Sequence, residues 1–432
     1  MLNCDYQSKA HQYIPGGAHT YSRGDDQFPS NAPPVLERGE GCYVYDIEGN
    51  KYLDYGMALR SVTIGYGYER IANAAIKQIK NGNGLTRASK IEVEAAEKMV
   101  SLIDGMDMIK FGKNGSTVTT AAVKLSRAYT GRNIIARCFQ HPFFSYDDWF
   151  IGDTIMNPGV PDEIKSLTVN FNFNDLESLK DIFSKYENQI ACVILEPATH
   201  VEPNEGFLQG VKELCHKNGA VFILDEMISG FRWDIKGAQK YYRVSPDLCT
   251  FGKGMANGFS VSALMGKKEI MELGGLFHDK ERVFLMSTTH GAEMSGLGAL
   301  CETIEVYKEL GVTDHLWSYG KKLKNGINSI SEELGIIDYF YIDGAEVSPA
   351  IATLGRDKNI SMEFRTLFLQ EMIKNRVLMP YIALCYSHGD IELEMTLEAV
   401  RESLKVYKKA IDNDVNSFLE CPVVKSVFRK YN

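Results

Sequence analysis

The sequence predicts an α/β protein with a large domain built on a mainly parallel sheet and a smaller α+β domain beside it. Short apolar runs alternate with amphipathic helical segments over residues 65–305, a pattern typical of parallel strands that are buried on both faces. The 432 residues are 44% hydrophobic and 24% charged, which is the composition of a globular protein. No apolar run approaches the ~20 residues that a membrane span requires.

The first segment, residues 1–64, predicts an irregular lobe with hairpin strands. Turn-forming stretches ("IPGGAHT", "NAPPV", "ERGEG", "DIEGN") separate two short alternating pieces, "CYVYD" at 42–46 and "KYLDYG" at 51–56. Such alternation between turn signals is typical of strands. The N-terminus has no apolar core of a secretory signal. We assign this segment to the small domain.

The central segment, residues 65–305, is expected to form the large domain. Its apolar runs predict strands at 108–111, 134–138, 191–197, 220–226, 248–253 and 261–266. Residues 306–432 are helical at 316–334, mixed at 375–384 and helical again at 390–411. We expect this last segment to complete the small domain.

Charge and cysteine usage exclude several classes of protein. The net charge is −9 and no basic run of five residues occurs, which argues against nucleic acid or an anionic membrane as a partner. The nine cysteines form no C-x-x-C pair, which argues against a disulfide framework or a zinc site and favours reduced thiols. We therefore expect a cytoplasmic protein without a bound metal.

Charged residues follow three of the predicted strands. Glu196 ends "VILE", Asp225 ends "VFILD", and Lys253 follows "CTFG". One such acid alone is most often a helix cap or a solvated loop residue. However, ligands of this architecture bind at the carboxyl ends of the strands, so an acid and a lysine at neighbouring strand ends face one cleft.

A lysine and an acid in one cleft suit a particular cofactor. Lysine forms a Schiff base with an aldehyde, and pyridoxal phosphate (PLP) acts as an electron sink when its ring nitrogen stays protonated. A buried carboxylate against that nitrogen keeps the proton in place. Lys253 and Asp225 therefore match the two parts of a PLP site.

A phosphate site is expected at Asn114, Gly115 and Ser116, which precede a predicted helix. The free N–H groups and the dipole of a helix N-terminus favour a phosphate, although an ordinary helix cap would have the same sequence. Gly131 is expected to end this helix. Its apolar stripe is Val118, Ala122, Leu125 and Tyr129. No nucleotide-binding glycine motif is present.

The segments "LDEMISGFRW" and "SPDLCTFGKGMANGFSVSALMG" resemble the class III (fold-type I) PLP-dependent aminotransferases. The nearest branch is that of glutamate-1-semialdehyde 2,1-aminomutase. The resemblance runs from "IPGGAHTYSR" through "YVYDIEGNKYLDYG", "AYTGR" and "VILEP" to "HGDIELEMTLEAV". It implies the fold-type I architecture, PLP as cofactor, and transfer of an amino group.

The resemblance assigns roles to residues of this chain. Lys253 matches the Schiff-base lysine, and Asp225 matches the aspartate on the pyridine nitrogen. Glu196 matches the acid of the family's E-P motif, one layer behind the cofactor. The phosphate loop falls on Asn114, Gly115 and Ser116, and the threonine that reaches the partner subunit's phosphate falls on Thr289. This last match implies a homodimer with shared active sites.

The sequence departs from the family at three places. The family's aromatic–His–Gly becomes "CFQHPFF", so that either Gln140 or His141 takes the position of the ring that stacks on the cofactor; we favour His141. Thr117 stands where the family has a glutamate. "STTHGAE" lacks the asparagine–proline that usually follows the cross-subunit threonine.

Two arginines bear on the substrate. Arg23 aligns with an aminomutase arginine that binds the substrate carboxylate, and Arg60 stands where that branch has a small residue. We expect Arg60 to bind an acidic or polyhydroxylated substrate; the alternative is a structural ion pair.

The sequence thus supports one function above two alternatives. The first is a PLP-dependent aminotransferase that moves an amino group from an amino-acid donor to an aldehyde or ketone, such as a sugar or a small carboxylic acid. The "GMALR" and "KGMANG" segments resemble an offshoot found with surface-polysaccharide sugar genes. The alternatives are glutamate-1-semialdehyde 2,1-aminomutase and a non-catalytic PLP-fold binding protein, and the intact site disfavours the second of these.

Overall fold

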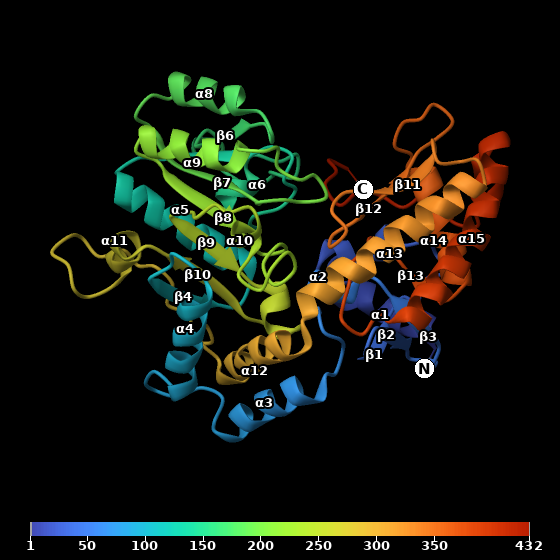
Figure 1. Cartoon of the computed structure of the whole chain (residues 1–432), viewed down its shortest axis with the longest axis horizontal. Coiled ribbons are helices and arrows are strands. Elements are labelled where there is room, and N and C mark those ends of the chain that lie inside the picture. Colours follow the sequence, from blue (N-terminus) through green and yellow to red (C-terminus); the bar gives the residue numbers. More distant parts are fainter. Residues whose placement is uncertain (1, 432) are drawn as a thin grey trace. The chain divides into compact units, whose positions relative to one another are not determined.

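A computed structural model describes residues 2–431 and divides the chain into two compact units. Unit 1 contains the chain up to Tyr68 together with Asp314–Arg429, and unit 2 contains Glu69–Thr313 and the C-terminal residues from Lys430. Each unit is described by itself below, with the element labels of Figure 1.

Unit 2 is built on a seven-stranded sheet with the strand order β4-β10-β9-β8-β7-β5-β6 (Figure 1). Only β10 runs antiparallel to its neighbours, so the predicted mainly parallel sheet is confirmed. The strands are β4 (Met108–Gly112), β5 (Ile134–Cys138), β6 (Thr168–Phe171), β7 (Ile190–Leu195), β8 (Val221–Asp225), β9 (Leu248–Phe251) and β10 (Ser262–Gly266).

The central strands form because their apolar side chains are buried on both faces of the sheet. Every residue of β5, β7, β8, β9 and β10 is buried, as expected of a sheet that helices cover on both sides. β6, at the sheet edge, was not predicted; its sequence "TVNF" alternates polar and apolar residues and is too short to stand out.

The helices of unit 2 pack on this sheet and on one another. α5 packs against the middle strands, α8 contacts β6 and α9, and α12 packs against α3 and α4. The longer helices are α3 (Glu69–Lys80), α4 (Lys90–Leu102), α5 (Gly115–Thr130), α8 (Leu176–Lys185), α9 (Phe207–Lys217) and α12 (Met294–Leu310). The short ones are α6 (Asp148–Ile151), α7 (Asp162–Lys165), α10 (Ala238–Tyr241), α11 (Lys268–Met271), η3 (Lys253–Ala256) and η4 (Glu272–Gly274).

The helix α5 begins and ends where the sequence predicts. Asn114 is its N-cap, and Gly131 ends it with a φ of 68°, a left-handed conformation that glycine adopts without strain. Val118, Ala122 and Leu125 are buried as expected. Tyr129 is 43% exposed, so its place in the apolar stripe is wrong, because the last turn of the helix extends past the core.

Unit 1 contains two small sheets and four long helices. The sheets have the strand orders β1-β2-β3-β13 and β11-β12. Its strands are β1 (Leu36–Glu40), β2 (Tyr43–Asp46), β3 (Lys51–Asp54), β11 (Phe340–Asp343), β12 (Ala350–Thr353) and β13 (Val377–Leu378). Its helices are α1 (Asn3–Tyr13), α2 (Met57–Arg60), α13 (which starts in unit 2; Val312–Glu333), α14 (Met362–Lys374), α15 (Asp390–Asp412), η1 (Tyr21–Arg23), η2 (Asp25–Gln27) and η5 (Val415–Phe418).

The short turn α2 is strained. Its residues have φ values from 40° at Met57 to 68° at Arg60, a region that costs energy for residues other than glycine. The buried carboxylate of Asp54 holds this turn, because it accepts hydrogen bonds from the backbone of Gly56 and Met57 at 2.7 and 2.9 Å. The hydroxyl of Tyr66 donates to the same carboxylate at 2.7 Å.

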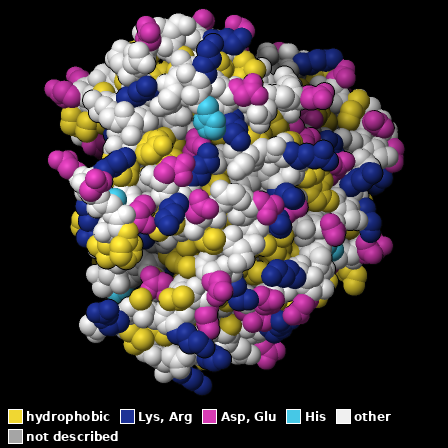
Figure 2. Space-filling view, turned by 60° about the vertical axis from the view of Figure 1, so that its left-hand side comes forward, with side chains coloured by type: hydrophobic (Ala, Val, Ile, Leu, Met, Phe, Trp, Pro, Cys, Tyr) yellow, Lys and Arg dark blue, Asp and Glu magenta, His cyan; other side chains and the backbone are white. Residues whose placement is uncertain are grey.

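Several surface and composition features of the described residues bear on function. Basic and acidic side chains are interspersed over the face in Figure 2. In residues 2–431 no helix combines the length and apolarity that crossing a membrane demands, and no cluster of His, Cys, Asp or Glu there could hold a metal ion. Each of the nine cysteines is a free thiol.

Candidate active site

Asp225 is the last residue of β8 and is almost completely buried, with 2% of its surface exposed. Its Oδ1 accepts a hydrogen bond from the Met227 N–H at 3.0 Å and another from the Thr250 hydroxyl at 2.9 Å. Burial raises the pKa of Asp225 to about 6, because the charged form lacks water. A cation at Oδ2 would stabilise this carboxylate.

Lys253 follows the adjacent strand β9, and its charge opposes the effect of burial on the pKa of Asp225. The lysine is partly buried and has a φ of 44°, a left-handed conformation that is strained for a residue with a side chain. The three residues after it are buried. The strained turn therefore holds the lysine at the carboxyl end of β9, one strand from Asp225.

The N-terminus of α5 supplies the third part of the site. Oδ1 of Asn114 accepts the N–H of Thr117 at 3.0 Å, and the buried Ser116 hydroxyl accepts the N–H of Tyr146 at 3.0 Å. The N–H groups of Gly115 and Ser116 have no acceptor within the helix. A phosphate is the ligand that such a helix N-terminus favours.

The side chain of Met227 links these parts. A Cβ on Gly252 would lie 2.5 Å from its Sδ, and a Cβ on Gly115 would lie 3.1 Å from the same atom. Met227 thus packs against the residue before Lys253 and against the first residue of α5. A side chain at either glycine would displace Met227, so the lysine turn and the helix N-terminus both pack closely against this one side chain.

His141 is buried beyond the end of β5 and contacts the segment of Glu196. Its Nδ1 accepts the backbone N–H of Glu196 at 2.9 Å, so the proton lies on Nε2, which has no hydrogen-bond partner among the described residues. Burial lowers the pKa of His141 to about 3, which keeps the ring neutral. Its ring packs against Phe173, with the ring centroids 4.9 Å apart. Gln140 is exposed and donates to Asn172.

The structure thus brings seven of the expected residues to one edge of the sheet of unit 2. The strands β5, β7, β8 and β9 are parallel, and their carboxyl ends lead to His141, Glu196, Asp225 and Lys253. The helix start at Asn114, Gly115 and Ser116 joins them through Met227. This edge is where ligands of open α/β sheets bind.

The other three expected residues lie elsewhere in the chain. Thr289 is exposed in the segment between η4 and α12. Arg23 is exposed in η1 of unit 1, and Arg60 belongs to the strained turn α2. The Nη1 of Arg60 donates to the Ser348 hydroxyl at 3.2 Å and to the Ile382 carbonyl at 3.1 Å.

Three supporting residues had no role in the sequence analysis. Thr250 faces Asp225 in the parallel register of β8 and β9, but the pairing of strands far apart in sequence gives no local signal. Met227 is one of many apolar residues. Glu226 is buried and caps α10, because its carboxylate accepts the N–H groups of Ala238 and Gln239.

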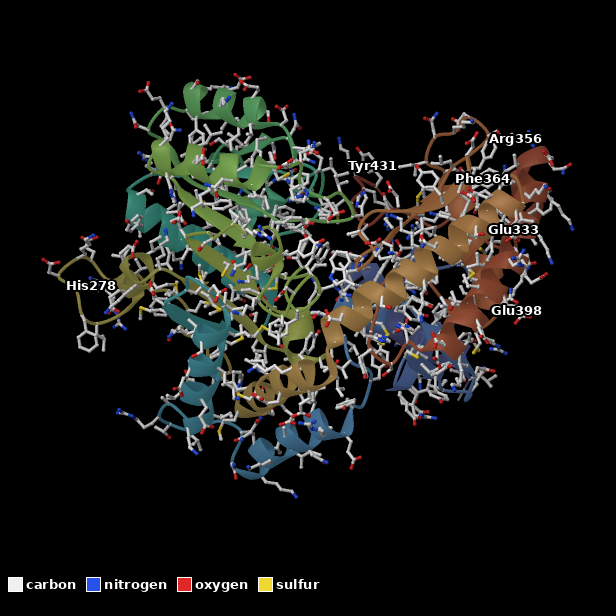
Figure 3. All side chains as sticks on the ribbon, in the orientation of Figure 1. His278, Glu333, Arg356, Phe364, Glu398 and Tyr431 are labelled. Atoms are coloured by element: carbon white, nitrogen blue, oxygen red, sulfur yellow. The ribbon has the colours of Figure 1, made fainter. Side chains whose placement is uncertain are left out.

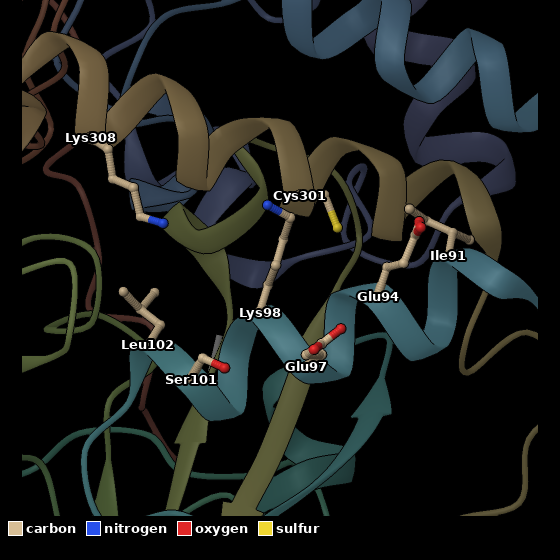
Figure 4. Close-up of a pocket in the computed structure, with 8 residues that line it drawn as sticks. All are labelled: Ile91, Glu94, Glu97, Lys98, Ser101, Leu102, Cys301 and Lys308. Atoms are coloured by element: carbon tan, nitrogen blue, oxygen red, sulfur yellow. The ribbon is translucent and has the colours of Figure 1, made fainter.

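A pocket of about 710 Å³ lies away from this edge, between α4 and α12 (Figure 4). None of the expected site residues lines it. Its wall includes Lys98, whose ammonium is paired with Glu305 at 2.5 Å. The chemistry of the sheet edge, and not the size of this pocket, identifies the candidate site.

The residues at the sheet edge fit pyridoxal phosphate. The buried Asp225 carboxylate suits a protonated ring nitrogen, Lys253 offers an amine, and the N-terminus of α5 offers N–H groups to a phosphate. The fold and these residues define a fold-type I PLP-dependent enzyme.

Comparison with known proteins gives the family. The family model described as aminotransferase class-III matches residues 24–340. The 3-aminobutyryl-CoA aminotransferase of Cloacimonas acidaminovorans (strain Evry) is 34% identical over 413 residues, which cover 93% of this chain and 96% of that protein. The chain belongs to the class-III aminotransferase family, and its cofactor is PLP.

A further relative and a solved structure also match most of the chain. The glutamate-1-semialdehyde 2,1-aminomutase of Francisella tularensis subsp. holarctica (strain FTNF002-00 / FTA) is 30% identical over 419 residues, covering 90% of this chain and 96% of that protein. The FumI protein of Sphingopyxis sp. MTA144, solved with PLP, has a TM-score of 0.87 at 24% identity and covers 98% of both chains. The expected family, fold and cofactor are therefore confirmed.

Proposed function

We propose that this aminotransferase uses Lys253 to carry its cofactor and to move the proton during transfer from an amino-acid donor to an aldehyde or ketone. PLP, when bound, supplies an aldehyde that joins amines and a ring that accepts electrons. The observation that carries the proposal is the buried Asp225 carboxylate, at the carboxyl end of β8 and one strand from Lys253.

The chain's own residues have distinct tasks in this proposal. Nζ of Lys253 would hold the cofactor and would act as the base that takes the proton from the donor Cα. Asp225 holds the proton on the ring nitrogen. The N–H groups of Gly115 and Ser116, next to Asn114, bind the phosphate.

His141 and Glu196 complete the site. The neutral ring of His141 would stack on the cofactor, and the backbone N–H of Glu196 fixes the orientation of this ring through Nδ1. The exposure of Gln140 favours His141 over Gln140 for this position.

A covalent trap tests the central residue. Borohydride should fix the cofactor on Lys253 of the purified protein, and mass spectrometry of the peptide identifies the position. Lys253→Ala should abolish the adduct and the transfer from glutamate or alanine. Labelling of a different lysine would reject the assignment.

The second candidate function is the intramolecular aminomutase reaction, which the 30% identical relatives named aminomutases favour. An aminomutase needs no external donor. Adding glutamate or alanine distinguishes the two functions: donor-dependent release of a keto acid supports the aminotransferase, whereas turnover of glutamate semialdehyde without a donor supports the aminomutase. A protein that binds no PLP would instead support the non-catalytic alternative.

We propose that Arg60 binds the acidic or hydroxyl groups of the acceptor, with Arg23 binding a substrate carboxylate. Nη1 of Arg60 donates two hydrogen bonds to neutral oxygens, and the guanidinium lies 4.8 Å from the centre of the Tyr381 ring.

Arg60→Ala should therefore raise KM for an acidic acceptor about tenfold or more while the cofactor spectrum stays unchanged, as expected for a lost charge-assisted hydrogen bond. A useful panel contains a small keto acid, a keto sugar and a ketone thioester of coenzyme A, because the 34% identical relative is named for a CoA substrate. An unchanged KM across the panel would leave Arg60 with the structural role.

The active enzyme is proposed to be a cytoplasmic homodimer in which Thr289 of each subunit reaches the phosphate of the other. The loop between η4 and α12 exposes Leu276, Phe277 and Phe284, and its residue His278 projects away from the sheet (Figure 3). Large exposed apolar side chains are typical of surfaces that another protein covers. The free thiols favour the cytoplasm.

A further inference from the structure

An ion pair joins two segments beside the phosphate-binding turn. Nζ of Lys113, in the turn between β4 and α5, lies 2.6 Å from Oε2 of Glu293, which immediately precedes α12. The two side chains are mostly buried, with 23% and 32% of their surfaces exposed. Because Lys113 directly precedes Asn114, the pair acts on the first residues of the phosphate-binding helix.

The Glu293 end of the pair is held by further hydrogen bonds. Its Oε1 accepts from the Asn83 amide at 2.7 Å and from the Ser295 hydroxyl at 3.2 Å. The backbone of Asn83 and its side chain in turn accept the N–H groups of Met294 and Ser295 at 2.9 and 3.0 Å. The start of α12 and the loop between α3 and α4 are thus fixed to one carboxylate.

The Lys113 end is fixed to the segment that follows Lys253. Nζ of Lys113 donates to the Ser260 carbonyl at 3.1 Å, and the Ser260 hydroxyl donates to the Lys113 carbonyl at 2.7 Å. The Ser262 hydroxyl donates to the carbonyl of Asn114 at 2.9 Å. A Cβ on Gly296 would lie 3.7 Å from Nζ, so the lysine crosses the first turn of α12 closely.

The carboxylate of Glu293 has a lowered pKa. The Lys113 ammonium and the Asn83 amide lower the pKa of Glu293 to about 2. The carboxylate is therefore ionised at neutral pH. The ion pair therefore joins the turn before α5, the segment after Lys253, the start of α12 and the loop between α3 and α4 without depending on protonation of Glu293.

We propose that Lys113 and Glu293 are positioning residues for the cofactor phosphate, because their ion pair fixes the turn at Asn114 to the segment after Lys253 and to the start of α12. This inference rests on the proposed phosphate site at Asn114, Gly115 and Ser116. Neither side chain needs to touch the cofactor. The pair instead keeps the N–H groups of Gly115 and Ser116 in the geometry that binds a phosphate.

The test compares two forms of the cofactor on the full chain. Glu293→Gln keeps the shape of the side chain and removes its charge, so PLP affinity should fall about three- to tenfold, the range for a partly exposed charged hydrogen bond. Pyridoxal, which lacks the phosphate, should bind the variant and the wild type equally well. Absorbance titration measures both affinities, and Lys113→Gln should reproduce the effect.

Two controls make the result specific. Lys113→Arg keeps the charge and should retain wild-type PLP affinity. Glu305→Gln removes an ion pair of similar length, with Lys98, away from the site, and should leave both affinities unchanged. The inference is overturned if PLP and pyridoxal lose affinity equally, or if neither Glu293→Gln nor Lys113→Gln lowers the affinity for PLP. Borohydride labelling of Lys253 in the wild-type protein is measured separately. Absence of this labelling would reject the proposed function, whereas normal labelling with unchanged PLP affinity in the variants would reject only the role of the ion pair.

Discussion

At the scale of single residues, the environment of Asp225 decides what the site can do. A buried carboxylate is expensive unless a positive partner compensates it. Here the Met227 N–H and the Thr250 hydroxyl, which are both neutral donors, bond to Oδ1. A cation beside this carboxylate would therefore stabilise its ionised form, and a protonated pyridine nitrogen is such a cation.

Asp225→Asn should slow the amino-donor half-reaction by about 10²–10³-fold, the cost of removing one preorganised electrostatic group from a buried site. The amide cannot hold the ring nitrogen in its protonated form. PLP should remain attached to Lys253, since that linkage does not depend on the ring proton. Single-turnover absorbance after mixing with glutamate or alanine measures the rate.

The control for this substitution is Thr250→Val, which removes one of the two hydrogen bonds to Oδ1. Its effect should be smaller, about three- to tenfold, because a single neutral hydrogen bond is lost. An Asp225→Asn rate within tenfold of the wild type would contradict the role given to this carboxylate.

The pH dependence of stability should report the same residue. Burial raises the pKa of Asp225 to about 6, above its ordinary value of about 4. Between these values the folded cofactor-free chain binds a proton that the unfolded chain does not. Its stability should therefore fall as the pH rises from about 4 to about 6.

Bound PLP should remove this part of the pH dependence, because a pyridinium favours the ionised carboxylate. Thermal unfolding of the cofactor-free and PLP-bound proteins across that pH range measures the difference. Burial also raises the pKa of Glu226, to about 7, and its contribution should persist in Asp225→Asn. If the variant and the wild type give the same cofactor-dependent change of slope, Asp225 is not its source.

At the scale of elements, the packing of Met227 against two glycines places the lysine turn beside α5. Gly252→Ala would put a Cβ 2.5 Å from Met227 Sδ, and such overpacking costs about 1–3 kcal/mol. We expect a lower unfolding temperature and weaker PLP binding. The double variant with Met227→Ala should recover much of the loss, because the side chain that clashes is gone.

A calorimetric scan and a PLP titration of the two single variants and the double variant complete this cycle. The φ of Gly252 is −176°, an extended conformation open to any residue, so backbone strain does not add to the effect. Additive losses in the double variant would show that Met227 does not transmit the clash.

The elements also show what the sequence could predict. Long apolar runs such as "ACVILEP" mark buried central strands, because burial on both faces leaves a continuous signal. Edge strands carry no such signal: β1 has the sequence "LERGE", which reads as a turn, and exposes most of its residues. The antiparallel direction of β10 depends on long-range pairing and could not be inferred from its residues.

For the site, the residues with distinctive chemistry could be predicted and those that support them could not. Lys253 and Asp225 stand out because charged residues at the ends of two neighbouring buried strands lie where this architecture binds its ligands. Thr250 and Glu293 act through contacts with residues far away in sequence. Their roles appear only when the strands and loops are assembled.

At the scale of the whole molecule, the proposed homodimer makes a specific claim about which residues form each active site. In a symmetric dimer each site would combine Lys253 of one subunit with Thr289 of the other. Thr289 is exposed in the isolated chain, as a residue that reaches a partner must be. The exposed side chains Leu276, Phe277 and Phe284 lie in the same loop.

Mixing two inactive variants tests this arrangement. Thr289→Glu should lose PLP because the new carboxylate repels the phosphate, and Lys253→Ala should be inactive. After the two proteins are unfolded together and refolded, half of the dimers should be mixed, and each mixed dimer should contain one site without either substitution. About a quarter of the wild-type activity should then return if the subunits exchange at random.

The neighbouring Thr288 provides the matched comparison, because it is also exposed. Thr288→Glu should bind PLP normally if Thr289 is the residue that reaches the phosphate. A defect confined to Thr288→Glu would move the role to that residue. Mass spectrometry should show that the refolded mixture contains mixed dimers. If it does and no activity returns, each site is built from a single chain, because each substitution then inactivates the subunit that carries it.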